Sequence, residues 1–149
     1  YLCKNFNLVA FGGGPFDKRE VRLIKELGLS QNKVMQSGGD DEVLASLYSH
    51  ASAFVYPSLY EGFGIPPLEA MSFDCPIVCS KEGSIPEVVG ECGVYFDPYS
   101  EHSINQALEK IIKDQKLRQE LINKGKNHIK NYSWEKCASE TYSIYEGLL

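Results

Sequence analysis

The chain has 149 residues, a length that suits one domain of ordinary size. Hydrophobic residues make up 43% and charged residues 23%, close to the globular average, so the composition excludes a disordered tail, a collagen and a coiled coil. The net charge of −5 argues against a basic face that binds nucleic acid. No window of 18 residues is uncharged and apolar, so the sequence predicts no membrane span.

The cysteine content favours a reducing compartment. The five cysteines are odd in number and form no pair of C-x-x-C motifs, so we expect buried thiols that act as small hydrophobic side chains. They are Cys3, Cys75, Cys79, Cys92 and Cys137. The chain opens with Tyr1 and shows no signal peptide, which predicts a cytoplasmic piece of a longer protein.

Short β-branched or aromatic runs alternate with helical patterns along most of the chain. The expected strands are 7–11, 34–36, 53–56, 76–79 and 93–96. The expected helices are 17–27, 41–51, 66–73 and 84–89, followed by three helices that begin after Ser100, Asp114 and Ser133. This alternation predicts an α/β fold, a Rossmann-like parallel sheet with helices on both faces. Ligands of such sheets bind at the carboxyl ends of the strands.

The loops that follow the expected strands are therefore the places to look for a ligand site. The first of them contains three consecutive glycines, Gly12 to Gly14, between a strand and a helix. A dinucleotide fingerprint would need glycine where Asp17 stands, and Pro15 removes one backbone donor. The pattern therefore indicates a tight turn beside a cleft rather than a nicotinamide site.

The third loop, residues 57–66, is the most informative. Gly62 and Gly64 flank an aromatic residue and allow the backbone to approach a ligand closely. The following helix is expected to start at Pro66-Pro67 and to point its free N–H groups at the cleft. Such a helix N-terminus suits a phosphate group.

Two glutamates flank this turn, with seven residues between Glu61 and Glu69. A carboxylate would repel phosphate but can accept hydrogen bonds from the paired hydroxyls of ribose or a sugar ring. Together the features suggest a sugar–diphosphate–ribose ligand. Two simpler explanations stay open at this point: Glu69 could stabilise the dipole of the first helical turn, and Glu61 could be a solvated loop charge.

Other residues predict structure rather than chemistry. Ser84-Ile85-Pro86-Glu87 matches a helix capping box. We expect the three histidines to be exposed surface residues and the aromatic residues near the C-terminus to pack between the last helices. These residues are His50, His102 and His128, and Tyr132, Trp134, Tyr142 and Tyr145. No His/Cys/Asp group has the spacing of metal ligands, so no metal is expected.

The segment from Tyr56 to Gly64, continued by Glu69-Ala70-Met71, closely resembles the donor-binding signature of the retaining family-four glycosyltransferases, which have the GT-B fold. Residues 75–80, 83–90, 93–98 and 132–135 fit the same family, so the resemblance covers about residues 7–149. It favours ligand-binding roles for both glutamates.

The resemblance implies a role for each motif residue. Glu69 would accept hydrogen bonds from the ribose hydroxyls, and Glu61 would contact the donor sugar as the catalytic glutamate. Backbone N–H groups would meet the sugar and diphosphate, the base would lie near the second strand end, and the first glycine turn would line the same cleft. The residues concerned are Gly62, Phe63, Gly64 and Ile65 for the backbone contacts, Met35, Gln36 and Ser37 for the base, and Gly12 and Gly14 for the turn.

In that family the domain begins with a further strand, loop and helix, which carry an Arg and a Lys that clamp the diphosphate, and an acceptor domain precedes it. The sequence here starts after those elements, so we expect residues 1–149 to be an incomplete donor-binding domain, the C-terminal half of a GT-B fold without its first strand and helix. The missing strand would lie in the middle of the sheet. Without the acceptor domain, the chain alone is expected to transfer no sugar.

The expected function is transfer of a sugar, with retention, from a nucleotide-diphosphate donor to a hydroxyl acceptor in cell-surface glycan synthesis. The donor would be GDP- or UDP-linked, with GDP-mannose the specific suggestion, and no metal or other cofactor would be needed. The missing domain would bind a glycan or lipid-linked acceptor, and parts outside this chain could hold the protein at the inner membrane. The alternatives are a non-catalytic nucleotide-sugar-binding module and another sugar-nucleotide enzyme, such as an epimerase.

Overall fold

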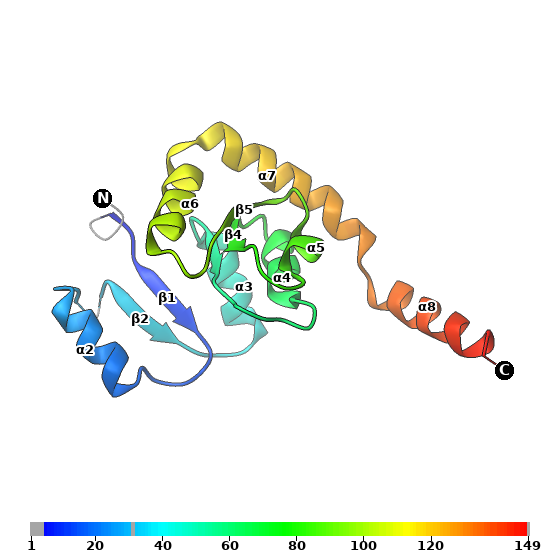
Figure 1. Cartoon of the computed structure of the whole chain (residues 1–149), viewed down its shortest axis with the longest axis horizontal. Helices are drawn as coiled ribbons and strands as arrows, with labels where there is room; N and C mark the ends of the chain where they lie inside the picture. The colour runs from blue at the N-terminus through cyan, green and yellow to red at the C-terminus, as the bar shows by residue number, and fades with distance from the viewer. Residues whose placement is uncertain (1–4, 31, 149) are drawn as a thin grey trace. The chain divides into compact units, whose positions relative to one another are not determined.

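The computed structural model describes residues 5–30 and 32–148, so the prediction about Cys3 lies outside the described residues. The chain divides into two compact units, Tyr1–Leu47 and Tyr48–Leu149, and each is described by itself. Figure 1 shows the strands and helices that alternate along both units.

The first unit contains two parallel strands, β1 (Leu8–Phe11) and β2 (Val34–Ser37), paired from Leu8 opposite Val34 to Phe11 opposite Ser37. Helix α2 (Lys18–Glu26) lies between them in sequence, and most of α3 (Asp41–His50) follows. Asp17 caps α2 through a capping box, because its carboxylate accepts from the N–H of Glu20 at 2.8 Å while the Glu20 carboxylate accepts from the N–H of Asp17 at 2.7 Å.

The second unit contains a three-stranded parallel sheet with β4 in the centre. Its strands are β3 (Phe54–Tyr56), β4 (Ile77–Ser80) and β5 (Gly93–Phe96). Its helices after α3 are α4 (Ile65–Ser72), α5 (Ile85–Val89), α6 (Glu101–Lys113), α7 (Gln115–His128), the short 3₁₀ helix η1 (Ile129–Asn131) and α8 (Trp134–Glu146). All four residues of β4 are buried, as the continuous apolar run predicts for a central parallel strand.

The five expected strands are confirmed, and all of their pairings are parallel. The described strands pair in two ladders, as β1–β2 and as β3–β4–β5, as expected for a doubly wound sheet that lacks a strand in its middle. If the missing strand is counted as the first of the doubly wound order, β1 and β2 are the second and third strands, and β3 to β5 are the fourth to sixth. In that order the second strand pairs with the third, and the fourth to sixth pair among themselves, as the two ladders do.

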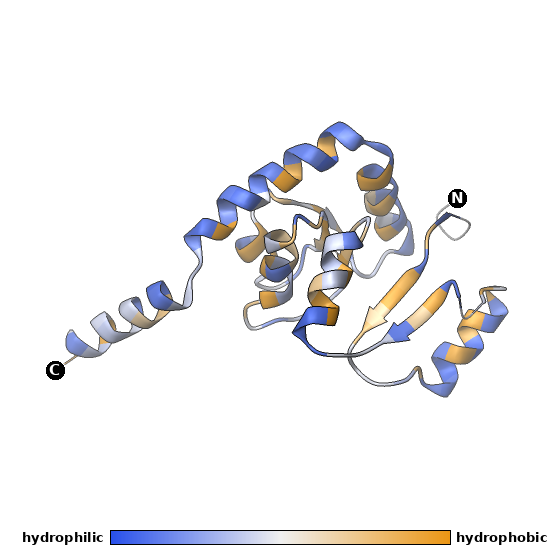
Figure 2. Cartoon of the chain, turned by 180° about the vertical axis from the view of Figure 1, so that it is seen from behind, coloured by the Kyte–Doolittle hydropathy of each residue, from blue (hydrophilic) through white to orange (hydrophobic). Residues whose placement is uncertain are grey.

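The core of the second unit lies between the sheet and helices α6 and α7. Val78 and Phe96 from the sheet pack with Ala107 and Ile111 of α6 and Leu121 of α7. Helices α4 and α5 contact β3 and β4. Figure 2 shows hydrophobic residues on the strands and along one stripe of α6, and polar residues over most of α7. This core fixes the positions of the strand ends from which the loops begin.

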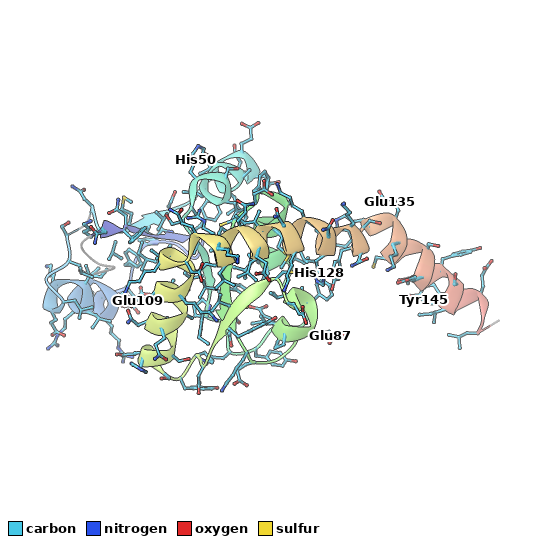
Figure 3. The ribbon with its side chains drawn as sticks, turned by 90° about the horizontal axis from the view of Figure 1, so that it is seen from above. His50, Glu87, Glu109, His128, Glu135 and Tyr145 are labelled. Atoms are coloured by element: carbon cyan, nitrogen blue, oxygen red, sulfur yellow. The ribbon has the colours of Figure 1, made fainter. Side chains whose placement is uncertain are left out.

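The C-terminal helix differs from the expectation. Every residue of α8 is exposed, including Trp134 at 76%, so the prediction that Trp134, Tyr142 and Tyr145 pack between helices is wrong for the described chain. Figure 3 shows Glu135 and Tyr145 on this exposed helix. These aromatic residues do lie at helical spacing on α8, but spacing alone does not show whether another element covers that face of the helix.

The thiol prediction is largely confirmed. Cys75, Cys79 and Cys92 are buried, whereas Cys137 on α8 is exposed. Burial raises the pKa of the Cys75 thiol to about 11 and that of Cys79 to about 12, so both stay protonated at neutral pH. These two residues act as packing groups.

We predict that Ile111→Ala lowers the free energy of unfolding by about 2–5 kcal/mol, because Ile111 is fully buried and the truncation leaves a cavity. The matched control is Ile144→Ala in α8, where the side chain is 64% exposed and the expected change is within about 0.5 kcal/mol. Urea denaturation of both variants measures the difference. Equal losses would show that this core is wrongly placed.

Candidate functional site

The turn between β3 and α4 is built around Gly64. This glycine is the N-cap of α4 and has φ +100°, a left-handed conformation that a residue with a side chain rarely adopts. It is also buried, and a Cβ there would lie 4.0 Å from the Tyr56 ring, so the turn is held close to the end of β3. Gly62 does not use a left-handed conformation.

The N-terminus of α4 lacks two backbone donors. The helix begins at Ile65 rather than Pro66, and with either start two prolines without an N–H occupy its first turn. The backbone N–H groups that remain are those of the turn, which include Gly64 and Ile65. An anion would therefore be bound by the turn backbone more than by the helix end.

Glu69 lies in the second turn of α4, five residues after the N-cap, and not in the first turn as expected. The dipole effect of a helix falls off within its first turn. Stabilisation of the helix dipole is therefore a poor explanation for this carboxylate.

Glu61 lies beside two hydroxyl groups. Hydrogen bonding with Tyr56, at the end of β3, and next with Ser58 holds the pKa of the Glu61 carboxyl below its ordinary value. The Ser58 hydroxyl also lies 3.1 Å from the Tyr60 carbonyl oxygen, so its single proton can go to only one of these two acceptors. Burial, with a smaller contribution from Glu61, raises the pKa of the Tyr56 phenol, which keeps it protonated as a donor. Glu61 is therefore a charged acceptor whose partners Tyr56 and Ser58 carry no positive charge.

Glu69 is held in a similar way from another element. The Tyr48 hydroxyl, near the end of α3, donates to Glu69 Oε2 at 3.3 Å. Tyr48 is 6% exposed, whereas Glu69 is half-buried. Burial first, and the Glu69 charge second, raise the pKa of Tyr48.

The two tyrosines belong to one group of packed rings. Tyr48 meets Phe54 edge-to-face with ring centroids 5.2 Å apart, and Phe54 stacks on Tyr56 at 5.6 Å. Phe73 stacks on the other side of Tyr48 at 6.2 Å. Aromatic pairs at these distances are mutually stabilising, so the supports of both glutamates share one packed cluster.

Ser84 secures the turn from the side of α5. Its hydroxyl lies 3.0 Å from the carbonyl oxygen of Glu61 and 2.9 Å from that of Phe63, so its single proton is donated to one of them or shared between them. The predicted capping box is wrong, because the Ser84 side chain makes no capping hydrogen bond in α5. Nothing in the local sequence could have indicated this contact, because its partners lie more than 20 residues away.

The exposed end of the turn contacts the C-terminal part of the unit. Phe63 meets the Tyr132 ring with centroids 6.1 Å apart. His128 lies beside Tyr132, and its Nε2 lies 2.8 Å from the Val88 carbonyl oxygen, to which it donates. His128 is thus half-buried and structural rather than exposed, whereas His50 and His102 are exposed as expected.

The predicted residues of the first unit also lie together. The N–H of Gly12 donates to the Ser37 carbonyl at 3.0 Å, and Gln36 Nε2 donates to the Gly12 carbonyl at 2.8 Å. Gly12 and Gly14 both have positive φ, which confirms a tight glycine turn. That this turn and Met35 face the same cleft as Glu61 and Glu69 stays a prediction.

The described residues carry neither a metal-binding cluster nor a membrane-spanning helix. Residues 5–30 and 32–148 contain no group of three His, Cys, Asp or Glu side chains arranged to hold a metal ion. Across the same residues, no helix is long and apolar enough to cross a bilayer.

Comparison with known proteins gives the family. The sequence model described as glycosyl transferases group 1 matches residues 2–128. The chain belongs to the group 1 glycosyl transferase family. It is 43% identical over 106 residues to O-antigen chain mannosyltransferase B of Escherichia coli, in an alignment that covers 71% of this chain and 28% of that protein.

Solved structures of glycosyltransferases agree with this assignment. The chain is similar to sucrose-phosphate synthase from Thermosynechococcus elongatus, with a TM-score of 0.80 and 28% identity over 95% of this chain and 38% of that one. It is also similar to the C-terminal domain of a group 1 family protein, LpcC, from Francisella tularensis, with a TM-score of 0.67 and 30% identity over 76% of this chain and 60% of that one. The expected fold, that of a GT-B C-terminal domain, is confirmed.

For this group 1 domain we predict that Tyr56→Phe raises the pKa of Glu61 toward the ordinary glutamate value of about 4.3, because the variant removes a hydrogen bond that favours the carboxylate. Carboxyl ¹³C NMR titration measures it. Tyr60→Phe, next to Glu61 but exposed, is the control and should leave this pKa unchanged.

The same change has a defined pH dependence. A folded-state pKa below the unfolded value contributes stability that is present above the unfolded pKa and disappears as the pH falls through the folded one. The stability difference between wild type and Tyr56→Phe should therefore be present at pH 7 and vanish in acid. A difference that persists at low pH would mean that Tyr56 acts only through packing.

Proposed function

We propose that residues 56–71 form the donor site of a retaining glycosyltransferase, which moves a sugar from a nucleoside-diphosphate sugar to a hydroxyl acceptor in the synthesis of a surface glycan. One observation carries the proposal: two carboxylates, each oriented by a tyrosine hydroxyl, flank a turn with backbone N–H groups at Gly64 and Ile65. Carboxylates suit sugar hydroxyls, and backbone amides suit phosphate.

Each part has a role in this proposal. Glu69 accepts hydrogen bonds from the ribose hydroxyls, and Glu61 accepts from hydroxyls of the donor sugar. The N–H groups of the turn, from Gly62 to Ile65, bind the sugar and diphosphate and stabilise the negative charge that develops on the leaving diphosphate. The bond from the sugar C1 to the diphosphate breaks, the acceptor oxygen bonds to C1 on the same face, and the acceptor proton leaves with the diphosphate.

The donor and acceptor are proposed from the relatives. The Escherichia coli relative is named as an O-antigen chain mannosyltransferase, which supports a mannose donor and a polysaccharide product. GDP-mannose is accordingly the first donor to test and UDP-sugars the second. The acceptor would be a glycan or lipid-linked glycan, bound by a part of the full-length protein outside this chain, at the cytoplasmic side of the inner membrane and without a metal.

We predict that the two glutamates fail differently in the full-length enzyme. Glu69→Ala should weaken a nucleoside diphosphate and its sugar conjugate alike, whereas Glu61→Ala should spare the diphosphate and weaken only the sugar conjugate. A hydrogen bond to a charged group contributes about 1.5–3 kcal/mol, so the expected losses are about ten- to over a hundredfold. Titration calorimetry with GDP and GDP-mannose, and with UDP and UDP-glucose, measures them.

The control is Glu135→Ala, an exposed first-turn glutamate of α8, which should change neither affinity. Equal loss of diphosphate binding in both site variants would refute the division of roles. Binding of donor by a full-length protein that neither transfers nor hydrolyses the sugar would instead favour a non-catalytic binding module.

A further inference from the structure

We propose that Tyr48 is a positioning residue that orients the Glu69 carboxylate toward the ribose, and that it thereby sets the preference for ribonucleotides over 2′-deoxyribonucleotides. The inference deepens the proposed function, because it rests on Glu69 as the ribose-binding residue. Its own content is the role of a side chain in α3, 21 residues before that glutamate.

The geometry places the phenol behind the carboxylate. Tyr48 is nearly fully buried, while Glu69 is half-buried, so the hydrogen bond to Oε2 comes from the interior side. An ionised carboxylate has about four lone-pair positions on two oxygens. The phenol occupies one of them and leaves Oε1 and the outer position of Oε2 for a ligand.

Orientation matters because a glutamate carboxylate otherwise rotates easily. Its terminal torsion is broad and has no sharp minima. A pair of vicinal hydroxyls needs both acceptor positions at once, so a carboxylate fixed in advance loses less freedom on binding. The Tyr48 hydroxyl can supply that restraint without adding a positive charge that would compete for the carboxylate.

The phenol itself is fixed. Phe54 contacts its ring edge-to-face, and Phe73 stacks against it. Burial and the neighbouring carboxylate raise the pKa of Tyr48, so it remains a donor throughout the physiological range. The second glutamate, Glu61, likewise has a phenol, that of Tyr56, as a hydrogen-bond partner.

The test compares ribo- and 2′-deoxyribonucleoside diphosphates on the full-length protein by calorimetry, with GDP and dGDP and with UDP and dUDP as probes. Wild type should prefer the ribonucleotide by about tenfold or more, the value of one charged hydrogen bond. Tyr48→Phe keeps the ring and removes the hydroxyl, and it should reduce this ratio to less than about threefold, as should Glu69→Ala.

Two further variants separate orientation from packing. Tyr95→Phe removes a half-buried phenol that donates to the Gly90 carbonyl at 2.5 Å, and it should leave the ratio unchanged. Phe73→Leu disturbs the stacking on Tyr48 but keeps its hydroxyl, and it should lower thermal stability while largely preserving the ratio.

Each result decides between the claims. An unchanged ratio in Tyr48→Phe, alongside a reduced ratio in Glu69→Ala, overturns the role of Tyr48 and leaves the proposed function intact. Equal reductions in Tyr48→Phe and Phe73→Leu assign the effect to packing and also overturn it. If wild type binds none of the four nucleotides, the proposed function fails and the role of Tyr48 with it.

Discussion

A carboxylate that binds sugar hydroxyls is well supported by a neutral donor, which occupies one lone-pair position and leaves the negative charge and the other positions for the ligand. Tyr48 and Tyr56 are such donors for Glu69 and Glu61. A phenol donates one hydrogen bond, stays neutral and is rigid when its ring is packed. The rings that pack against Tyr48 are those of Phe54 in β3 and of Phe73 at the end of α4.

The core of the second unit determines where Tyr56 and the turn after it lie. The buried strand β4 pairs with β3, so the end of β3 at Tyr56 is fixed by the core that α6 and α7 cover. From there the chain turns through Gly64, and Ser84 holds the turn by its carbonyl groups. Stability and binding are therefore coupled, since one strand carries both the core contacts and the support of Glu61.

Much of this arrangement can be predicted from the sequence. Alternating apolar runs and helical stripes locate every strand and helix that the proposed site uses, and the turn around Gly62 and Gly64 makes Glu61 and Glu69 candidates. The family resemblance, rather than the spacing, favours ligand-binding roles for both. Local patterns could not predict contacts between distant segments. The bonds of Ser84 and Tyr48 span more than 20 residues, and the exposure of Trp134 depends on whether another element covers α8. The loss of two donors at the start of α4 does follow from the sequence, because Pro66 and Pro67 lie in the first turn whether the helix begins at Ile65 or at Pro66.

Amide hydrogen exchange of the full-length protein, with and without GDP-mannose or UDP-glucose, tests the central claim most directly. A ligand that binds at the turn should slow exchange of the backbone N–H groups of residues 62–65 and of residues 68–69, which include Glu69. The effect on α6 should be smaller. Residues 66 and 67 report nothing because they are prolines. Clear binding that slows exchange elsewhere and leaves residues 62–69 unchanged would contradict the account.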